Sequence, residues 1–561
     1  MLTKGTTREP REGNLAIDFI EASRFFKGTK FWDDVLGAFE AENGALLKHF
    51  VDDFNRLDYD RRAELISRYA DWSNYAFMVL MRLLVILFQN RKRVASERLF
   101  NELNEASLEA LSRSQDVIHR ITRIFNHYPR LVNNYLLALS EENQLKFIAL
   151  LEENIWEDEV AQLRDHLLSL CQLHCCSNRY FKRFFLNIIN SYPDYIQYIN
   201  NTEKLKELAK GLFGKIDNLK TFGEKKDRLG HYYDIEFFRI GLETLAGAPI
   251  EQTNTDFTEF SDNYLQTLFD VCKQEVEQER GEKLNTRDLL AVFAAGGHAR
   301  EQAFDDDYDI IVLLNSADEE MRKNCTTIIS KMNTELVKRG TLPHFRFADR
   351  FGHYVTLFEE IIQLFEDDTE DSFIDKSQIL GARMVVGSRC FEQTFRAHII
   401  QPHIFNKKEQ YIRQMAQEIQ ARHRGEERNK ENGFNIKENL GGLRDIEMIM
   451  LMYKAALHIE TPVSRKLFDE LSEQIPQRKA DFHNLSRIFS FLKHLRDLYR
   501  LSVAADDTIC LENLDRVSDK MQFHTPQELM DTFGEHMQQG WNIVSAMRAE
   551  LEPPDPHRSG K

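Results

Sequence analysis

The chain has 561 residues, of which 73 are Lys or Arg and 90 are Asp or Glu, so its formal net charge is −17. This acidic balance argues against non-specific binding to a nucleic-acid backbone. A hydrophobic content of 42% argues against general disorder. With only 25 Gly and 12 Pro, long helices are favoured over a turn-rich all-β fold. We therefore expect about two to four domains.

The N-terminal residues 1–14 are polar, lack the apolar stretch of a secretion signal and are predicted to be a disordered tail. The longest apolar run, Ala76–Phe88, is too short to span a bilayer and contains Arg82. The seven cysteines are odd in number and scattered, which is typical of reduced thiols. We expect a cytoplasmic protein with no membrane partner, and we interpret the Cys171–Cys176 cluster as helix packing rather than a metal site.

Residues 15–250 carry apolar side chains at three- and four-residue spacing, which predicts a helical N-terminal region. One break is expected at residues 223–233, because this stretch combines many charges with glycine. The apolar pattern changes after residue 250, which marks a predicted domain boundary.

Residues 251–400 are predicted to form a small α/β domain. A helix at about Phe257–Glu282 leads to the apolar run Leu289–Ala295. Glycines, a short helical stretch and an acidic cluster separate this run from a second one, Ile310–Leu314. A helix at about Ala317–Arg339 and a further strand-like segment follow.

Residues 401–550 return to a helical pattern and are predicted to form a C-terminal domain. Residues 551–561 are predicted to be a second disordered tail. The whole pattern predicts an α+β fold that is mostly α-helical, with the small α/β domain flanked by helical bundles.

Asp307 and Asp309 stand one residue apart at the start of the second apolar run. Because strand side chains alternate, both carboxylates would project from one face, where a divalent cation offsets their repulsion. Mg²⁺ is commonly held by one or two carboxylates together with substrate phosphates. Asp305 and Asp307 form a competing pair, and three consecutive aspartates also fit a solvated loop. We favour Asp307 and Asp309 as metal ligands, because Asp309 abuts the apolar strand.

Gly296 and Gly297 lie between a predicted strand and a short helix, where backbone N–H groups can approach a phosphate closely. Arg300 could add charge-assisted hydrogen bonds. These parts fit nucleotidyl transfer, in which metal ions bridge the attacking oxygen, the phosphorus and the leaving pyrophosphate.

The order of a strand, a glycine loop with Arg300-Glu301, the Asp307-Tyr308-Asp309 element and an apolar strand resembles the DNA-polymerase-β-type nucleotidyltransferases. More closely, it resembles their glutamine synthetase adenylyltransferase and PII uridylyltransferase group. A second match is NIKENLGGLRDIEMI, Asn435–Ile449, which resembles that group's K-x-G-x-G-G-[IL]-R-D-I-E/Q segment. The resemblance covers roughly residues 170–510.

The resemblance implies that Lys437 and Arg444 face the nucleotide. It also implies that Asp445 and Glu447 contact the binding residues and are not metal ligands themselves. The alternative is that Arg444 and Asp445 merely cap and pair at a helix start. The resemblance also implies an Mg²⁺-dependent transferase, with Mn²⁺ as an alternative ion and a nucleoside triphosphate as substrate.

We expect this transferase to move AMP from ATP to a hydroxyl, by resemblance a protein tyrosine, and the helical N-terminal region to recognise that protein. No nucleic-acid partner is expected, because the chain has no clear basic stripe interleaved with aromatic residues.

The chain departs from the group where a third carboxylate is usual. In adenylyltransferases that segment reads V-D-x-R-L-R-P, and matching Arg346 to its first arginine puts His344 at the aspartate. Histidine is a poor Mg²⁺ ligand, although it can accept a proton near neutral pH. Asp349 is the nearby carboxylate and our third candidate catalytic residue, although it lies on the opposite face of the alternation. The alternative function is therefore a catalytically degenerate nucleotide-sensing or protein-binding regulator.

Overall fold

The computed structural model describes residues 201–553 except 306, 340–341, 367–369, 425–433 and 505. Before residue 201 it describes 37, 45–58, 60–62, 82–87, 98–103, 105, 135 and 198. The chain divides into two compact units, residues 1–175 with 185–200, and residues 176–184 with 201–561. The first unit contains helix α3 (Ala45–Asn55), whose buried face includes Leu47, Phe50 and Phe54. The predicted N-terminal tail, the Cys171–Cys176 cluster and residues 554–561 lie outside the described residues.

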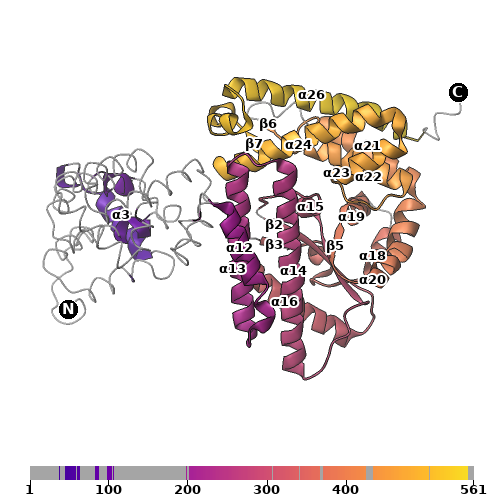
Figure 1. Ribbon diagram of the computed structural model, residues 1–561, viewed down its shortest axis with the longest axis horizontal. Coiled ribbons are helices and arrows are strands. Elements are labelled where there is room, and N and C mark those ends of the chain that lie inside the picture. Colours follow the sequence, from indigo (N-terminus) through magenta and orange to yellow (C-terminus); the bar gives the residue numbers. More distant parts are fainter. Residues whose placement is uncertain are drawn as a thin grey trace. The chain divides into compact units, whose positions relative to one another are not determined.

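The second unit begins with a helical layer, in which α13 and α14 run side by side (Figure 1). Its elements are α12 (Thr202–Phe213), η3 (Ile216–Asn218), α13 (Phe222–Leu245) and α14 (Ile250–Arg280). These helices belong to the same unit as the sheet that follows, whereas our predicted domain boundary at residue 250 stays a prediction.

The prediction of a break at residues 223–233 is wrong, because helix α13 continues through them. Thr221 and Glu224 form a capping box that starts the helix ahead of the charged stretch. Gly230 serves close packing: a Cβ there would lie 2.9 Å from the guanidinium carbon of Arg339. Tertiary contact, rather than a turn, therefore accounts for this glycine.

A small mixed sheet follows, with strand order β3-β2-β1-β5 and β4 paired to the far end of β2. Strand β1 is antiparallel to β2 and β5, whereas β3 is parallel to β2. The two predicted apolar strands are confirmed, and β2 begins three residues before Ile310, so it includes both Asp307 and Asp309. The strands are β1 (Leu290–Ala294), β2 (Asp307–Leu314), β3 (Leu342–Phe345), β4 (Thr356–Leu357) and β5 (Arg383–Val386).

The side chains of β2 alternate between two covered faces. On one face the Tyr308 hydroxyl lies 2.9 Å from the Ser261 hydroxyl on α14. On the other face Ile311 and Leu313 join a core with aromatic side chains from the helices after the sheet. Asp307 and Asp309 share this second face by alternation, at the end of the strand where it begins.

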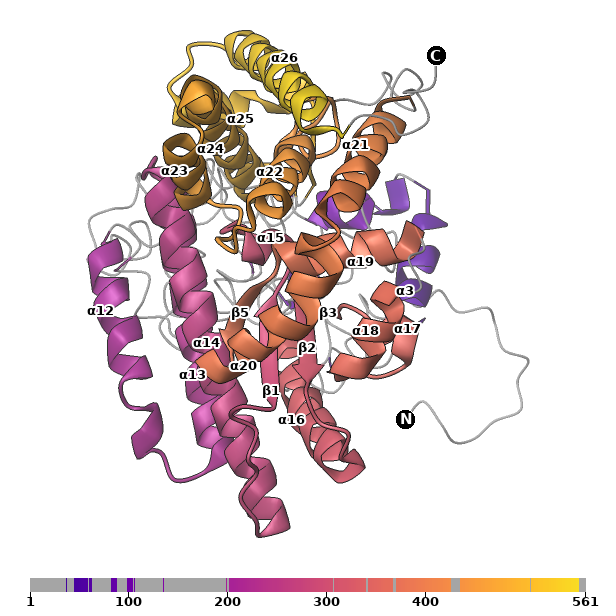
Figure 2. The same cartoon turned by 90° about the vertical axis from the view of Figure 1, so that its right-hand side faces the viewer.

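Helices cover both faces of the sheet and one of its ends. Those between and beside the strands are α15 (Gly296–Ala299), α16 (Glu319–Lys338), α17 (Ala348–Phe351), α18 (Phe358–Glu366), α19 (Glu370–Gly381), α20 (Arg389–Phe395) and the π-helix η4 (Arg396–Phe405). Helix α16 packs against α14, whose Ser261 contacts the first face, whereas α18, α19, α20 and η4 supply side chains to the core on the second face. Figure 2 shows the later helices, α22 to α26, gathered at the end of the sheet near α15.

The C-terminal elements share one hydrophobic core with the second face of the sheet. They are α21 (Lys408–Arg424), β6 (Phe434–Asn435), α22 (Leu443–Leu457), α23 (Arg465–Gln474), η6 (Pro476–Arg478), α24 (Lys479–Ser502), β7 (Thr508–Ile509), η7 (Leu511–Asn513), α25 (Asp515–Ser518), η8 (Asp519–Met521) and α26 (Pro526–Leu551). The predicted class, a mostly helical α+β fold, is confirmed. Within the described part of the chain, no helix is both long and apolar enough to cross a bilayer.

Candidate active site

Asp307, Asp309 and His344 converge where β2 begins. Each offers one ligand atom, and these three atoms lie within 4.8 Å of one another. His344 is the register partner of Asp309 on the parallel strand β3, which brings its Nδ1 to 3.2 Å from Oδ1 of Asp309. Among the described residues, this is the one group of three His, Cys, Asp or Glu side chains with the geometry to hold a metal ion.

The two aspartates of this group differ in environment. Asp309 is buried, and its second oxygen, Oδ2, accepts a hydrogen bond of 2.9 Å from Nη2 of Arg346. The backbone N–H of Arg346 donates to the carbonyl of Ile310 at 2.8 Å, which extends the strand pairing beyond β3. Asp307 is exposed. The two carboxylates therefore differ in burial, with that of Asp309 held inside the protein and that of Asp307 accessible to solvent.

The predicted glycine loop packs directly against carboxylates. Gly296 has a φ of +55°, and a Cβ there would lie 1.9 Å from Oδ2 of Asp309. A Cβ on Gly297 would lie 1.9 Å from Oδ2 of Asp305. Glycine is required at both positions because the backbone approaches these oxygens so closely. The loop that we expect to approach phosphate thus lies beside the candidate metal ligand.

An ion-pair chain joins the two sequence segments that carry the family resemblance. Arg300, which follows α15, is buried and its Nη1 lies 2.6 Å from Oε1 of Glu447 on α22. The other oxygen of Glu447 lies 3.7 Å from the guanidinium of Arg444. Arg300 was predicted to contact the nucleotide, and in this structure its guanidinium pairs with Glu447.

The side chain of Arg444 is about a third exposed, and it interacts electrostatically with Asp309 of the candidate metal site. Burial acts to lower its pKa, but Glu447, Glu438 and Asp309 together raise that pKa above its ordinary value. A permanently charged, partly open guanidinium near Asp309 is well suited to bind phosphate oxygens.

Lys437 lies in the turn before α22, and Asp445 lies in the first turn of that helix. Lys437 is half-buried and its charge reaches Asp507. The carboxylate of Asp445 is buried, and its Oδ2 accepts a 2.8 Å hydrogen bond from the backbone N–H of Gly441. Asp445 therefore holds the turn at the helix start, as the alternative interpretation of this segment expected.

Helix α24 supplies a feature that the sequence analysis missed. Lys493, Arg496 and Arg500 lie three and four residues apart, so they share one helix face. We call them the α24 clamp. All three donate to backbone carbonyls of the loop before β2. The acceptors are Arg300 and Glu301 for Lys493, Ala303 for Arg496 and Phe304 for Arg500.

The α24 clamp holds a loop with unusual backbone geometry. Glu301 and Phe304 have φ values of 55° and 56°, a region that non-glycine residues rarely adopt. Arg496 also pairs with Asp305, whose carboxylate accepts hydrogen bonds from Gln302 as well. Asp305 therefore serves the loop, and the competing Asp305/Asp307 metal pair loses support.

The structure places Asp349 apart from the cluster. It lies in α17, after β3 has ended, and its side chain is exposed. The group of described residues that can hold a metal contains His344 and not Asp349. A catalytic role for Asp349 stays a prediction without geometric support.

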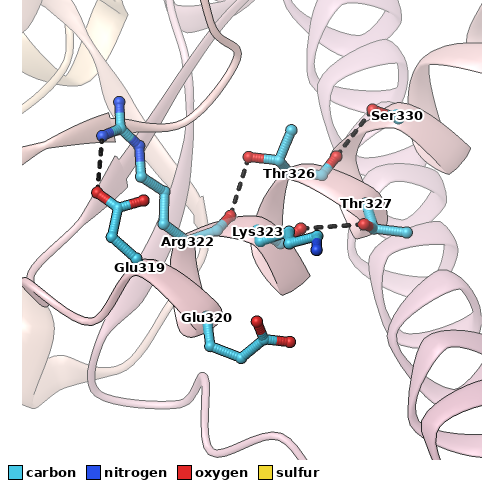
Figure 3. Close-up of a pocket in the computed structure, with 7 residues that line it drawn as sticks. All are labelled: Glu319, Glu320, Arg322, Lys323, Thr326, Thr327 and Ser330. Carbon is cyan, nitrogen blue, oxygen red and sulfur yellow. Dashed lines mark hydrogen bonds and ion pairs between the residues drawn. The ribbon is translucent and has the colours of Figure 1, made fainter.

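A hollow of about 570 Å³ lies on α16, away from these residues (Figure 3). Its hydroxyl groups are already engaged, because Thr326, Thr327 and Ser330 each donate to the carbonyl four residues earlier. We assign it no ligand. It is lined by Glu319, Glu320, Arg322, Lys323, Thr326, Thr327 and Ser330.

Comparison with known proteins points to the same group as the motifs. Residues 410–551 match the family model described as GlnD PII-uridylyltransferase. A bifunctional uridylyltransferase/uridylyl-removing enzyme of Nitrosococcus oceani is 24% identical over 237 residues, which are 42% of this chain and 24% of that protein. The enzyme of the same name from Pseudoalteromonas translucida is 26% identical over 265 residues, 44% of this chain and 27% of that protein.

These matches support a place for this chain in the nucleotidyltransferase group. The chain matches about a quarter of the length of each relative. The matched family model covers α21 to α26, the helices that carry Arg444, Glu447 and the α24 clamp.

Proposed function

We propose that the protein transfers a nucleoside monophosphate from a nucleoside triphosphate to a hydroxyl group, with a divalent metal ion. The observation that carries this proposal is the convergence of Asp307, Asp309 and His344 beside Gly296. The sequence resemblance favours AMP from ATP, whereas the names of the relatives add UMP from UTP as a second candidate. The acceptor is a protein, and by resemblance a tyrosine on it.

The donor set fits a divalent cation. Asp307 and Asp309 would hold it through carboxylate oxygens, with His344 adjacent to both. When bound, the ion would neutralise charge that develops on the phosphate oxygens and on the leaving pyrophosphate.

The surrounding residues bind and orient the triphosphate. Gly296 has no side chain, which lets the loop backbone that we expect to bind phosphate lie directly against the Asp309 carboxylate. Arg444, whose side chain is about a third exposed, offers a guanidinium that can bind the phosphate oxygens. In the reaction, the acceptor oxygen forms a bond to the α-phosphorus, the bond from that phosphorus to the pyrophosphate oxygen breaks, and the hydroxyl proton leaves to solvent.

The test uses the full chain with ATP or UTP radiolabelled at the α-phosphate and candidate acceptor proteins. We expect label on protein from one of the two nucleotides. Asp307→Asn should lower transfer by at least about a hundredfold, since even residues behind a metal ligand are worth about 10- to 100-fold. Asp349→Asn tests the other candidate carboxylate. We expect it to keep most of the transfer because Asp349 is exposed and outside the cluster, whereas a loss like that of Asp307→Asn would restore its predicted catalytic role.

A specific observation favours a second candidate function. His344 stands where the group usually has an aspartate, and Arg346 occupies one oxygen of Asp309. Both features fit a nucleotide-binding regulator that has lost transfer. Nucleotide binding that depends on Arg444, with no label moved to any acceptor, would assign this function instead.

A further inference from the structure

We infer that the site selects a first-row transition ion such as Mn²⁺ over Mg²⁺, with Nδ1 of His344 as a direct metal ligand. This inference rests on the metal site of the proposed function. It names the kind of ion and a third ligand.

The strand register is what gives His344 this position. Four consecutive pairs join β2 and β3, and the third of them aligns Asp309 with His344. Phe345, the next residue, is buried on the opposite face. A slip of one residue would turn the imidazole away and direct the phenyl ring toward the carboxylates. The hydrogen bond from the Arg346 N–H to Ile310 fixes the register just beyond the histidine.

The distances suit two ligands of one ion. Nδ1 of His344 lies 3.2 Å from Oδ1 of Asp309. Two adjacent ligands of an octahedral ion with bonds of about 2.0–2.1 Å lie roughly 3 Å apart. The His344 side chain is 47% exposed, so an ion can reach its ring without disrupting the core.

Arg346 makes the two oxygens of the Asp309 carboxylate inequivalent, because it hydrogen-bonds only one of them. Its guanidinium holds Oδ2 at 2.9 Å, so Oδ1, the oxygen beside His344, is the one left to an ion. Asp309 is then a one-oxygen ligand in a fixed orientation. Asp307, which is exposed, supplies the third atom of the group.

The chemistry of this donor set decides which ion it prefers. Mg²⁺ takes oxygen ligands and releases its waters reluctantly. Imidazole nitrogen suits transition ions, and mixed nitrogen and oxygen sites are typical of them. A site with two carboxylates and an imidazole thus offers Mg²⁺ one ligand that it accepts poorly.

The experiment measures metal binding directly on the full chain, without turnover. Mn²⁺ is titrated and followed by electron paramagnetic resonance, Mg²⁺ affinity is obtained by competition, and electron spin echo modulation reports a nitrogen bonded to Mn²⁺. We expect a nitrogen signal in the wild type. In His344→Asp the signal should disappear, and the preference for Mn²⁺ over Mg²⁺ should fall by roughly tenfold or more.

The matched control is His353→Gln, a histidine on a neighbouring loop that pairs with Glu360 outside the cluster. It should leave the nitrogen signal and both affinities unchanged. Bound Mn²⁺ without nitrogen coupling, or an unchanged preference in His344→Asp, overturns the inference.

The outcomes separate this inference from the proposed function. Nitrogen-coupled Mn²⁺ with no nucleotide transfer supports the metal assignment and contradicts the transferase. Transfer supported equally by Mg²⁺ and Mn²⁺, without nitrogen coupling, supports the transferase and overturns the metal assignment.

Discussion

The guanidinium of Arg300 and the carboxylate of Glu447 form a 2.6 Å ion pair between chain segments 147 residues apart. The side chains are 9% and 11% exposed, so both charges are largely removed from water. The pair connects the loop before β2 with α22, the two places where the sequence resembles nucleotidyltransferases.

Removing one partner of this pair should destabilise the fold strongly. In Glu447→Ala the Arg300 charge stays buried without its main partner, a change that costs about 3–5 kcal/mol. Urea unfolding measures this loss. Arg444→Ala is the control, because its 3.7 Å contact with the same glutamate involves a more exposed side chain and is worth about 0–1 kcal/mol. An equal loss of unfolding free energy in the two variants would show that the buried Arg300–Glu447 pair is not what stabilises this part of the fold.

Gly296→Ala should damage the candidate metal site. The new Cβ would meet Oδ2 of Asp309 at 1.9 Å, so the carboxylate must move and Mn²⁺ binding should weaken by roughly tenfold or more. Gly247→Ala controls for backbone strain, because Gly247 also has positive φ (+83°) but has nothing within 4 Å of its Cβ position. It should lose about 1–2 kcal/mol of stability and keep its metal affinity. Unchanged Mn²⁺ binding in Gly296→Ala would show that Asp309 is not a ligand.

The α24 clamp can be tested through its central residue. Arg496→Met leaves Asp305 without a buried cationic partner and the Ala303 carbonyl without a donor, so we expect a loss of about 3–5 kcal/mol. Arg487→Met, on an exposed face of the same helix, should stay within about 0.5 kcal/mol of the wild type. Hydrogen exchange at residues 300–305 should accelerate in the first variant alone. Slow exchange there in Arg496→Met would rule out the clamp.

The buried Lys454 should make the free energy of unfolding depend on pH, and the direction follows from its lowered pKa. It is fully buried on α22, and burial lowers its pKa from 10.5 to about 7, while its Nζ donates to the Leu380 carbonyl at 2.8 Å. Between about pH 7 and pH 10 the unfolded chain therefore holds a proton that the folded chain has released, so the free energy of unfolding rises with pH. Lys454→Met should remove this rise. Parallel urea titrations at several pH values measure it, and identical slopes for both proteins would contradict the shifted pKa.

Local sequence pattern was enough to predict the two strands that lead to and carry the aspartates. The alternation of β2 was predictable from the residues after Asp309, and it puts Asp307 and Asp309 on one face in the structure. The continuous helix through Gly230 was not predictable. That glycine makes room for the side chain of Arg339, a residue more than a hundred positions away in the sequence. Glycine alone signals a turn as readily as a close contact.

The parts of the site that were missed depend on long-range pairing. The family motif puts His344 at the position of the usual aspartate, but the choice between His344 and Asp349 depends on the register of β3 against β2, which brings His344 to the aspartates. The spacing of Lys493, Arg496 and Arg500 was visible, but their acceptors are backbone carbonyls, which no residue type reveals. A basic helix face gives the same pattern when it faces solvent.

The α24 clamp also sets the order in which this site can assemble during synthesis. The loop at Arg300 leaves the ribosome 193 residues before Lys493, which donates to its carbonyl. Until α24 has emerged and docked, the carbonyls of Glu301 and Phe304, two residues with left-handed backbone, lack the side-chain donors that α24 supplies. A nascent chain therefore carries both aspartates long before α24 is present to hold the loop in front of them, and a chain that ends before α24 lacks these contacts.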